Sequence, residues 1–460
     1  MRLAYNKKIK LMYSQSDKIT LPSLVAPIFL QNFLTMMMGS INVFMLGHYS
    51  DQAVGAVGVA NQYITMLLML YSITSSGTAI VISQYLGAKE NKKSAKVSMV
   101  ALMLNTLLGV ILSVAFLLFS HQMVRLMNLK PIMMADAVVY IQIVGGTSVI
   151  QAILNAMFAI TRSYGKANLP LYVALAMNFI NILGNFCVIF RPFYIPLYGV
   201  SGVAIVQVFS SFVACLMMAF MMSRMKIGLD LKDLVPFPKM EIYDIMHIGL
   251  PAASEGLSYN LSQIVSTFII TLIGTVELTT RIYVQNIVFF VSVFGLSIGQ
   301  ASQIIIGRFV GANMLNEADR VNKKNLELAV CASFLLSLCL LLMSKPLMGL
   351  FTKDPQIMKI GISILTFDIF VEIGRAFNNV ESNSLRGAGD AIFCMKVAFT
   401  SMWGVSVMLS YFFGVILHLG LMGVWFAFAM DEWCRAILLL RRWYSGKWKS
   451  MSLIKYETQK

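Results

Sequence analysis

Apolar stretches of membrane-spanning length recur along the whole chain, and they constrain its fold more than any other feature of the sequence. A helix crosses a bilayer with about 20 apolar residues, and about twelve such stretches can be counted. Of the 460 residues, 58% are hydrophobic and only 12% charged, which is more apolar surface than a water-soluble core can bury. Because lipid offers the backbone no hydrogen-bond partner, these stretches are predicted to be helices. The expected spans are 20–46, 54–82, 97–119, 137–160, 169–190, 199–222, 246–273, 281–306, 326–344, 357–384, 391–414 and 421–440.

The chain also repeats itself with a period of about 224 residues. The segment 83–89 has a counterpart in 307–313, and Arg162 in its Arg-x-x-Gly motif has one in Arg386. The longest polar interval, 222–241, joins the two copies. The sequence thus predicts an all-α integral membrane protein of twelve transmembrane helices in two pseudo-symmetric six-helix bundles, an N-lobe at 1–235 and a C-lobe at 236–460. Two similar bundles suit a molecule whose halves rock against each other.

The distribution of positive charge predicts the orientation in the membrane. With both termini in the cytoplasm, about 28 of the 36 Lys and Arg residues fall in cytoplasmic segments. We therefore expect a multi-pass protein of the cell membrane with cytoplasmic termini. The net charge of +15 is explained by this topology and by contact with anionic membrane lipids, so nucleic-acid binding is not needed to account for it.

Motifs of enzymes and cofactor sites are not found in the sequence. The six Cys residues are scattered without a close pair, and no two His residues stand at ligand spacing on one helix face. No nucleotide-binding Gly-rich loop and no catalytic constellation is present. A transporter or receptor without a cofactor is expected rather than an enzyme, with an ion gradient as the energy source.

Charged residues at membrane depth are rare and often mark transport paths. The seventh span carries Glu255, and the tenth carries Asp368, Glu372 and Arg375 on one helix face. Glu372 and Arg375, at i and i+3, are expected to form an internal ion pair. Glu255, Asp368 and Glu372 are the candidate cation-coupling residues, and Arg375 is expected to adjust their proton affinity. Glu255 and Asp368 are also candidate ligands of Na⁺.

Amides take the place of charges in the first half. They either line a cavity or join helices by hydrogen bonds. Together with 33 Met and 30 Phe they are compatible with an adaptable cavity for amphipathic ligands. The candidate cavity residues are Asn32, Asn42, Asn155, Asn178 and, in the second half, Asn379.

These motifs, in their order and repeat spacing, resemble the multidrug and toxic compound extrusion (MATE) family. The carriers are the loop 84–90, the two Arg-x-x-Gly motifs, Glu255 in its Gly-Leu-Pro-Ala-Ala-Ser-Glu context, and Leu-Arg-Gly-Ala-Gly-Asp at 385–390. The resemblance implies an antiporter that exports drug-like, often cationic compounds in exchange for Na⁺ or H⁺, and Glu255 matches the family's acid of span seven. Two positions depart from the family: Asn42 replaces an acid of the first span, and Arg375 stands where some members have an acid.

Three functions are compatible with these features. The first is a multidrug efflux antiporter that works as a monomer by alternating access on small organic cations or drugs. The second is a lipid-linked oligosaccharide flippase of the same broad fold, which a chain stopping soon after Trp448 and a single deep basic residue, Arg375, disfavour. The third is a non-transporting membrane receptor or channel, which would bind ligand without moving it uphill.

Overall fold

The computed structural model describes residues 20–127, 131–191 and 198–454, and nearly all of these residues are helical. The first half of the chain forms α2 (Leu21–Gly47), α3 (Asp51–Gly87), α4 (Asn91–Leu126), α5 (Pro131–Tyr140) continued by the π-helical turn η1 (Ile141–Gly145), α6 (Val149–Ser163), α7 (Asn168–Phe190) and α8 (Gly199–Arg224). The second half forms α9 (Lys239–Ile273), α10 (Thr275–Gly311), α11 (Leu315–Leu342), α12 (Ser344–Gly349), α13 (Pro355–Ala388), α14 (Ala391–Ser401), η3 (Met402–Val407), α15 (Met408–Tyr411), η4 (Phe412–Ile416) and α16 (Gly420–Tyr444). Short 3₁₀ helices lie in the linker (η2, Leu231–Leu234) and after α16 (η5, Lys447–Ser450).

The described helices account for the twelve predicted spans. Nine are long and apolar enough to cross a membrane, and the pair 133–145 and 149–163, bent by 47°, forms a tenth. The other two long helices, α13 and α16, bring the number of described spans to twelve, and both carry several charged residues. The prediction of an all-α membrane protein is confirmed. The fourth span expected at 137–160 lies within the bent pair, which η1 and a turn interrupt before Val149.

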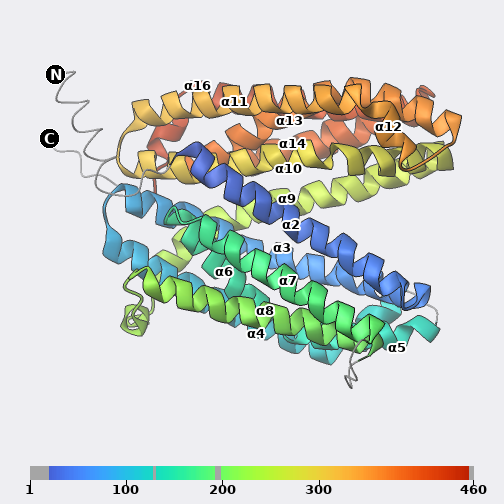
Figure 1. Ribbon diagram of the computed structural model, residues 1–460. Coiled ribbons are helices and arrows are strands. Elements are labelled where there is room, and N and C mark those ends of the chain that lie inside the picture. The colour runs from blue at the N-terminus through green and yellow to red at the C-terminus, as the bar shows by residue number, and fades with distance from the viewer. Residues whose placement is uncertain (1–19, 128–130, 192–197, 455–460) are drawn as a thin grey trace.

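The helices form two bundles, and α2 and α9 each contact both of them (Figure 1). In the view of Figure 1, α3 to α8 lie in the lower half and α10 to α16 in the upper half, and α2 crosses between them. Helix α2 packs against α7 of its own bundle and α10 of the other, and α9 packs correspondingly against α14 and α3. The predicted lobe boundary at 235/236 falls between η2 and α9.

The internal repeat has a structural counterpart where α3 and α10 cross at one end of the molecule. Gly87 lies so close to the carbonyl of Arg308 that a Cβ atom would stand 2.1 Å from its oxygen. Gly311 approaches the carbonyl of Gln84 in the same way, at 1.9 Å. These residues are equivalents one repeat apart, so the crossing is related to itself by a pseudo-two-fold axis. Only glycine permits this distance between the two backbones.

Side-chain hydrogen bonds across the crossing follow the same symmetry. Gln84 donates through Nε2 to the carbonyl of Gly387 at 2.9 Å, and Arg308 donates through Nη2 to the carbonyl of Ser163 at 2.7 Å. The two motifs that repeat in the sequence therefore contact each other, each loop of one half binding the Arg-x-x-Gly segment of the other. We refer to Gln84, Gly87, Arg308 and Gly311 as the crossing cluster.

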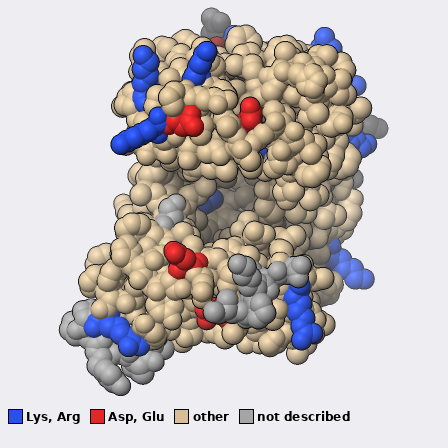
Figure 2. Space-filling view, turned by 90° about the vertical axis from the view of Figure 1, so that its right-hand side faces the viewer, with Lys and Arg blue, Asp and Glu red and all other residues tan. Residues whose placement is uncertain are grey.

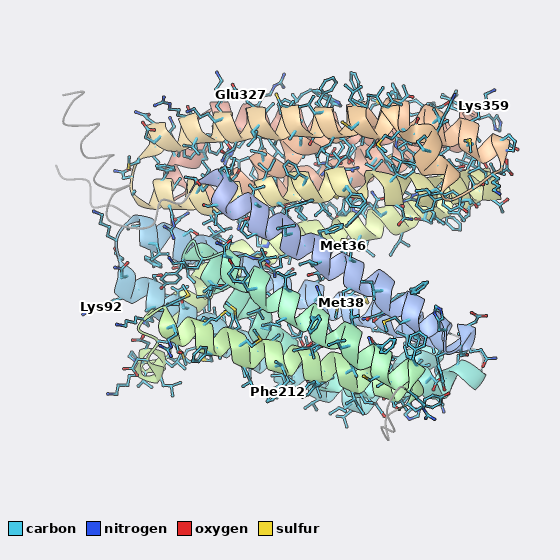
Figure 3. The ribbon with its side chains drawn as sticks, viewed as in Figure 1. Met36, Met38, Lys92, Phe212, Glu327 and Lys359 are labelled. Atoms are coloured by element: carbon cyan, nitrogen blue, oxygen red, sulfur yellow. The ribbon has the colours of Figure 1, made fainter. Side chains whose placement is uncertain are left out.

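The opposite end of the molecule is open. Figure 2, which views the end away from the crossing cluster, shows a deep hollow between the two halves. The side-chain view marks the two ends by Lys92, at the start of α4 near the crossing, and Lys359, on the first turns of α13 (Figure 3). The two bundles are thus joined at one end and separated at the other.

Candidate functional site

A network of buried charges connects α13 to α16 and α10 inside the C-lobe. On α13, Glu372 forms the expected ion pair with Arg375. Both side chains bond to Ser292 of α10, whose Oγ lies 3.1 Å from Glu372 Oε1 and 2.9 Å from Arg375 Nη1. Glu372 is only 1% exposed, which places this pair in the protein interior.

Helix α16 supplies the other half of this network. Arg375 Nε lies 3.3 Å from Glu432 Oε1, and Arg435 Nη2 lies 3.1 Å from the same carboxylate and 2.8 Å from Asp431. Ser401 also donates to Asp431, at 2.6 Å. The sequence prediction that Arg375 is the only deep basic residue is therefore wrong, because Arg435 is as buried as its two acidic partners. Three charges within five residues of an expected span, 431–435, were the signal for this part of the site.

The network holds more acids than bases. Asp368 lies one turn from Glu372 on α13 and accepts a hydrogen bond from Trp425 Nε1 of α16 at 2.8 Å. Among the described residues no cation forms a salt bridge with Asp368, so it is less neutralised than Glu372. We define the charge cluster as Asp368, Glu372, Arg375, Asp431, Glu432 and Arg435. Its four carboxyl groups face two guanidinium groups, so bound cations or protons are needed to balance it.

Glu255 lies elsewhere in the C-lobe and has partners of its own. Its carboxylate accepts a hydrogen bond from Ser382 Oγ at 3.2 Å and lies 3.8 Å from Arg386 Nη1. Its side chain is 15% exposed. The Arg-x-x-Gly motif at the end of α13 thus brings a guanidinium to this deep acid.

The repeat gives Glu255 a neutral counterpart in the N-lobe. One repeat earlier the equivalent positions are Gln31 and Arg162, and Arg162 Nη2 donates to Gln31 Oε1 at 2.6 Å. The contact between these two positions is thus part of the repeated architecture of both lobes. Of the two lobes, only the C-lobe has a carboxyl group at this contact.

The structure does not bring Glu255 and Asp368 into one site. Glu255 binds Ser382, which is 14 residues after Asp368 on the same helix, or about 21 Å along its axis at 1.5 Å per residue. A single Na⁺ ion held by both carboxylates is therefore excluded in this conformation. The described residues contain no group of three or more His, Cys, Asp or Glu side chains arranged for a metal ion.

The amide residues of the N-lobe form a hydrogen-bonded chain between α2, α7 and α8. Asn185 donates to Asn42 at 2.9 Å and to Asn181 at 2.8 Å, and Asn181 donates to Gln207 at 2.8 Å. Asn42, which stands where the MATE family has an acid, is therefore tied to α7. Asn178, also on α7, is buried, and its Oδ1 has no hydrogen-bond partner among the described residues.

The remaining candidate amides are dispersed. Asn32 of α2 reaches the other lobe, with Nδ2 3.4 Å from Ser297 Oγ and 3.5 Å from Gln300 Oε1 on α10. Asn379 packs on the α10 glycines Gly295 and Gly299. Asn155 is half-buried on α6. Asn32 and Asn42 thus join helices by hydrogen bonds and do not meet in a shared ligand pocket.

Two bundles joined at one end, a hollow between them, and a buried network of excess negative charge are the features of a membrane transporter. Comparison with known proteins identifies the family. The MatE family model matches residues 27–187 and 251–412, one segment in each lobe. The chain is 38% identical over 449 residues to the "Uncharacterized transporter YisQ" of Bacillus subtilis, which covers 97% of this chain and 99% of that protein. This protein belongs to the MatE family, whose members are transporters and not enzymes.

Other relatives and solved structures agree with this assignment. The "Probable multidrug resistance protein NorM" of Thermotoga maritima is 26% identical over 444 residues, covering 95% of this chain and 94% of that protein. A structure described as an outward-facing conformation of a multidrug resistance MATE family transporter of the MOP superfamily superposes with a TM-score of 0.85 at 20% identity, over 93% of this chain and 96% of the other. A crystal structure of MATE in the bent conformation gives 0.87 at 20% identity, over 94% and 96% of the two chains. These likenesses establish the fold.

Proposed function

We propose that this protein is a multidrug efflux antiporter, which exports amphipathic organic cations in exchange for Na⁺ or H⁺ by alternating access. Several relatives bear the name multidrug resistance protein, among them NorM of Thermotoga maritima. The observation that carries the proposal is the excess of two carboxyl groups in the charge cluster of α13 and α16. A cluster that requires bound cations changes its occupancy when its access to water changes, and this is what an antiporter needs.

The coupling ion is proposed to bind at the acidic end of the charge cluster, between Asp368 and Glu372. These two acids lie one helical turn apart, and only Glu372 contacts Arg375 directly. Arg375 and Arg435 neutralise Glu372, Glu432 and Asp431 only in part. The negative charge that remains can be balanced by one or two monovalent cations. The Glu255–Arg386 pair is proposed to act separately, near the closed end, because Glu255 adds a carboxyl group where the N-lobe has the neutral amide of Gln31.

The proposed orientation places the crossing cluster and both termini at the cytoplasmic face of the cell membrane. The hollow of Figure 2 then faces outward. The organic cation would enter between the lobes from the cytoplasm when the crossing cluster separates. A monomer suffices for this cycle, since each chain contains both lobes.

Purified protein in proteoliposomes tests the function directly. Movement of a fluorescent cationic dye is measured with an imposed Na⁺ gradient and, separately, with an imposed H⁺ gradient. We expect uphill dye movement with one of the two gradients. Asp368→Asn and Glu372→Gln should each abolish uphill movement while dye counterflow without a gradient persists, and Glu327→Gln, at an exposed carboxylate of α11, should leave both unchanged.

The alternatives give different results in the same vesicles. A receptor or channel would bind dye, or let it equilibrate, without uphill movement in either gradient. A flippase would translocate a lipid-linked oligosaccharide and leave the dye gradient untouched. Dye movement that is insensitive to both gradients would contradict the proposal.

A further inference from the structure

A pocket unrelated to the charge cluster lies where α11 begins and where α13 and α16 end. It has a volume of about 180 Å³, and the residues that line it include Asp319, Asn322 and Lys323 of α11, Glu381 of α13 and Trp443 of α16. Asp319 and Lys323 are exposed, whereas Asn322 and Glu381 are each 1% exposed. The pocket therefore leads from the surface to a buried carboxyl group.

Glu381 and Asn322 contact each other through one hydrogen bond, and each has a second oxygen that lacks a hydrogen-bond donor. Asn322 Nδ2 donates to Glu381 Oε1 at 2.9 Å. The other oxygens of the two groups, Glu381 Oε2 and Asn322 Oδ1, are both buried, and among the described residues neither has a hydrogen-bond partner. Two buried acceptors without a donor, on side chains that already contact each other, are unfavourable.

A single proton on Glu381 resolves both unmatched oxygens. A carboxylic acid donates through its O–H while its carbonyl oxygen accepts, and a side-chain amide offers the complementary acceptor and donor. An ionised Glu381 would instead be a buried charge, and the described residues place no salt-bridge partner against it. The charged groups that line the same pocket are Asp319, Arg320 and Lys323, all on α11 and all exposed, and α16 contributes only Trp443 and Tyr444.

The pair belongs to the C-lobe alone. One repeat earlier, the positions of Glu381 and Asn322 are occupied by Met157 and Ser98, which cannot form this contact. Another pair of positions, in contrast, has a polar contact in both lobes: Gln31–Arg162 in the first and Glu255–Arg386 in the second. The carboxyl–amide pair is thus an addition to the repeated architecture and not a consequence of it.

We propose that Glu381 and Asn322 form a proton-binding site that exchanges with water through this pocket. Asp319 stands at the pocket mouth, where its Oδ1 accepts a hydrogen bond from Trp443 Nε1 at 2.7 Å, and it is the group through which a proton reaches Glu381. Loss of the proton leaves an anion facing α11, where Arg320 and Lys323 are the available counter-charges. The site thereby makes the packing of α11 on α13 sensitive to pH at this end of the molecule.

Infrared difference spectroscopy of the full-length protein in nanodiscs tests the proposal without any transport. The spectrum of Glu381→Gln is subtracted from that of the unmodified protein at neutral pH. We expect the difference to contain the carbonyl band of one protonated carboxyl group. Glu327→Gln, an exposed acid on α11 labelled in Figure 3, should give only the bands of an ionised carboxylate.

A second variant keeps the test informative if Glu381→Gln folds poorly. Asn322→Ala retains the carboxyl group but removes its partner, so the carbonyl band of Glu381 should shift to the frequency of an unbonded acid. Carboxylate bands in place of a carbonyl band for Glu381, or an unshifted band in Asn322→Ala, would overturn the proposal. Disappearance of the carbonyl band on adding Na⁺ at constant pH would also overturn it, because Na⁺ would then be the ligand.

Discussion

At the scale of single residues, the role of the Glu255 carboxylate can be tested because the N-lobe has the equivalent contact with a neutral amide, Gln31, in its place. Glu255→Gln makes the C-lobe contact resemble that between Gln31 and Arg162. We expect the melting temperature to change little, since an amide oxygen can lie beside Arg386 as that of Gln31 lies beside Arg162. Gradient-driven dye movement should fall at least about tenfold if the ionisable group is required, which corresponds to about 1.4 kcal/mol.

The reverse substitution is the matched control for this residue. Gln31→Glu gives the N-lobe the carboxylate–guanidinium pair of the C-lobe and should leave coupled transport intact. Unchanged coupling in Glu255→Gln would show that the contact is structural in both lobes.

Arg435 offers a test of the charge cluster that does not depend on transport. Replacing it by Met leaves Asp431 and Glu432 buried without their closest cation. Breaking a buried ion pair in this way costs about 3–5 kcal/mol, so a marked fall in thermal stability is expected. Arg441→Met, at an exposed position of the same helix, should change stability by no more than about 0.5 kcal/mol. Thermal unfolding in detergent, followed for both variants, makes the comparison; equal stability would mean that the cluster is solvated.

At the scale of helices, the crossing of α3 and α10 depends on two glycines. Gly311→Val introduces a Cβ 1.9 Å from the carbonyl oxygen of Gln84, and neither backbone can move without separating the helices. We expect Gly311→Val, and equally Gly87→Val, to abolish the closed contact at this end or to prevent folding.

Gly58→Ala on α3 is the control for the crossing, because a Cβ at that position meets no atom within 4 Å. It should be neutral or slightly stabilising, by up to about 1 kcal/mol, as expected for alanine in a helix. Thermal stability and the yield of monodisperse protein distinguish the variants. A well-folded Gly311→Val of normal stability would contradict the close crossing.

The sequence predicted the helices better than it predicted the site, and the reasons are physical. Apolar length and the repeat fix the number of spans and their grouping, because both properties are carried by whole segments of the chain. The i, i+3 pair of Glu372 and Arg375 was also predictable, because it lies within one helix. Which helix neutralises Arg375 depends on how α13 packs against α16, and no local pattern in the sequence encodes that packing.

Glu255 and Arg386 illustrate the same limit. Both were recognised in the sequence, one as a deep acid and the other as part of a repeated motif, but their contact required the fold. The relation of Gln31 to Glu255 could have been read from the repeat of about 224 residues alone. That equivalence does not by itself predict a contact, because the hydrogen bond between Gln31 and Arg162 is likewise seen only in the fold.

At the scale of the whole molecule, the structure is closed at the crossing cluster and hollow at the other end (Figure 2). The hydrogen bonds of Gln84 and Arg308 across the lobes favour this state. Replacing both residues by Ala removes two interlobe bonds, each of about 0.5–1.5 kcal/mol, or more for the charged donor. A shift of about 1–3 kcal/mol is enough to change the populations of two states about 5- to 150-fold.

Spin-label distances on the two ends measure that shift. One label pair at Lys92 and Lys324 reports on the closed end, and a second pair at Gln52 and Lys359 reports on the open end; all four positions are exposed. In the double variant Gln84→Ala and Arg308→Ala, the first distance should lengthen in part of the population while the second shortens. Gln62→Ala, an exposed amide of α3, should leave both distributions unchanged. If the two ends respond independently, with the first distance lengthening while the second stays fixed, the lobes do not move as rigid bodies about a common axis, and rocking between the two bundles is refuted.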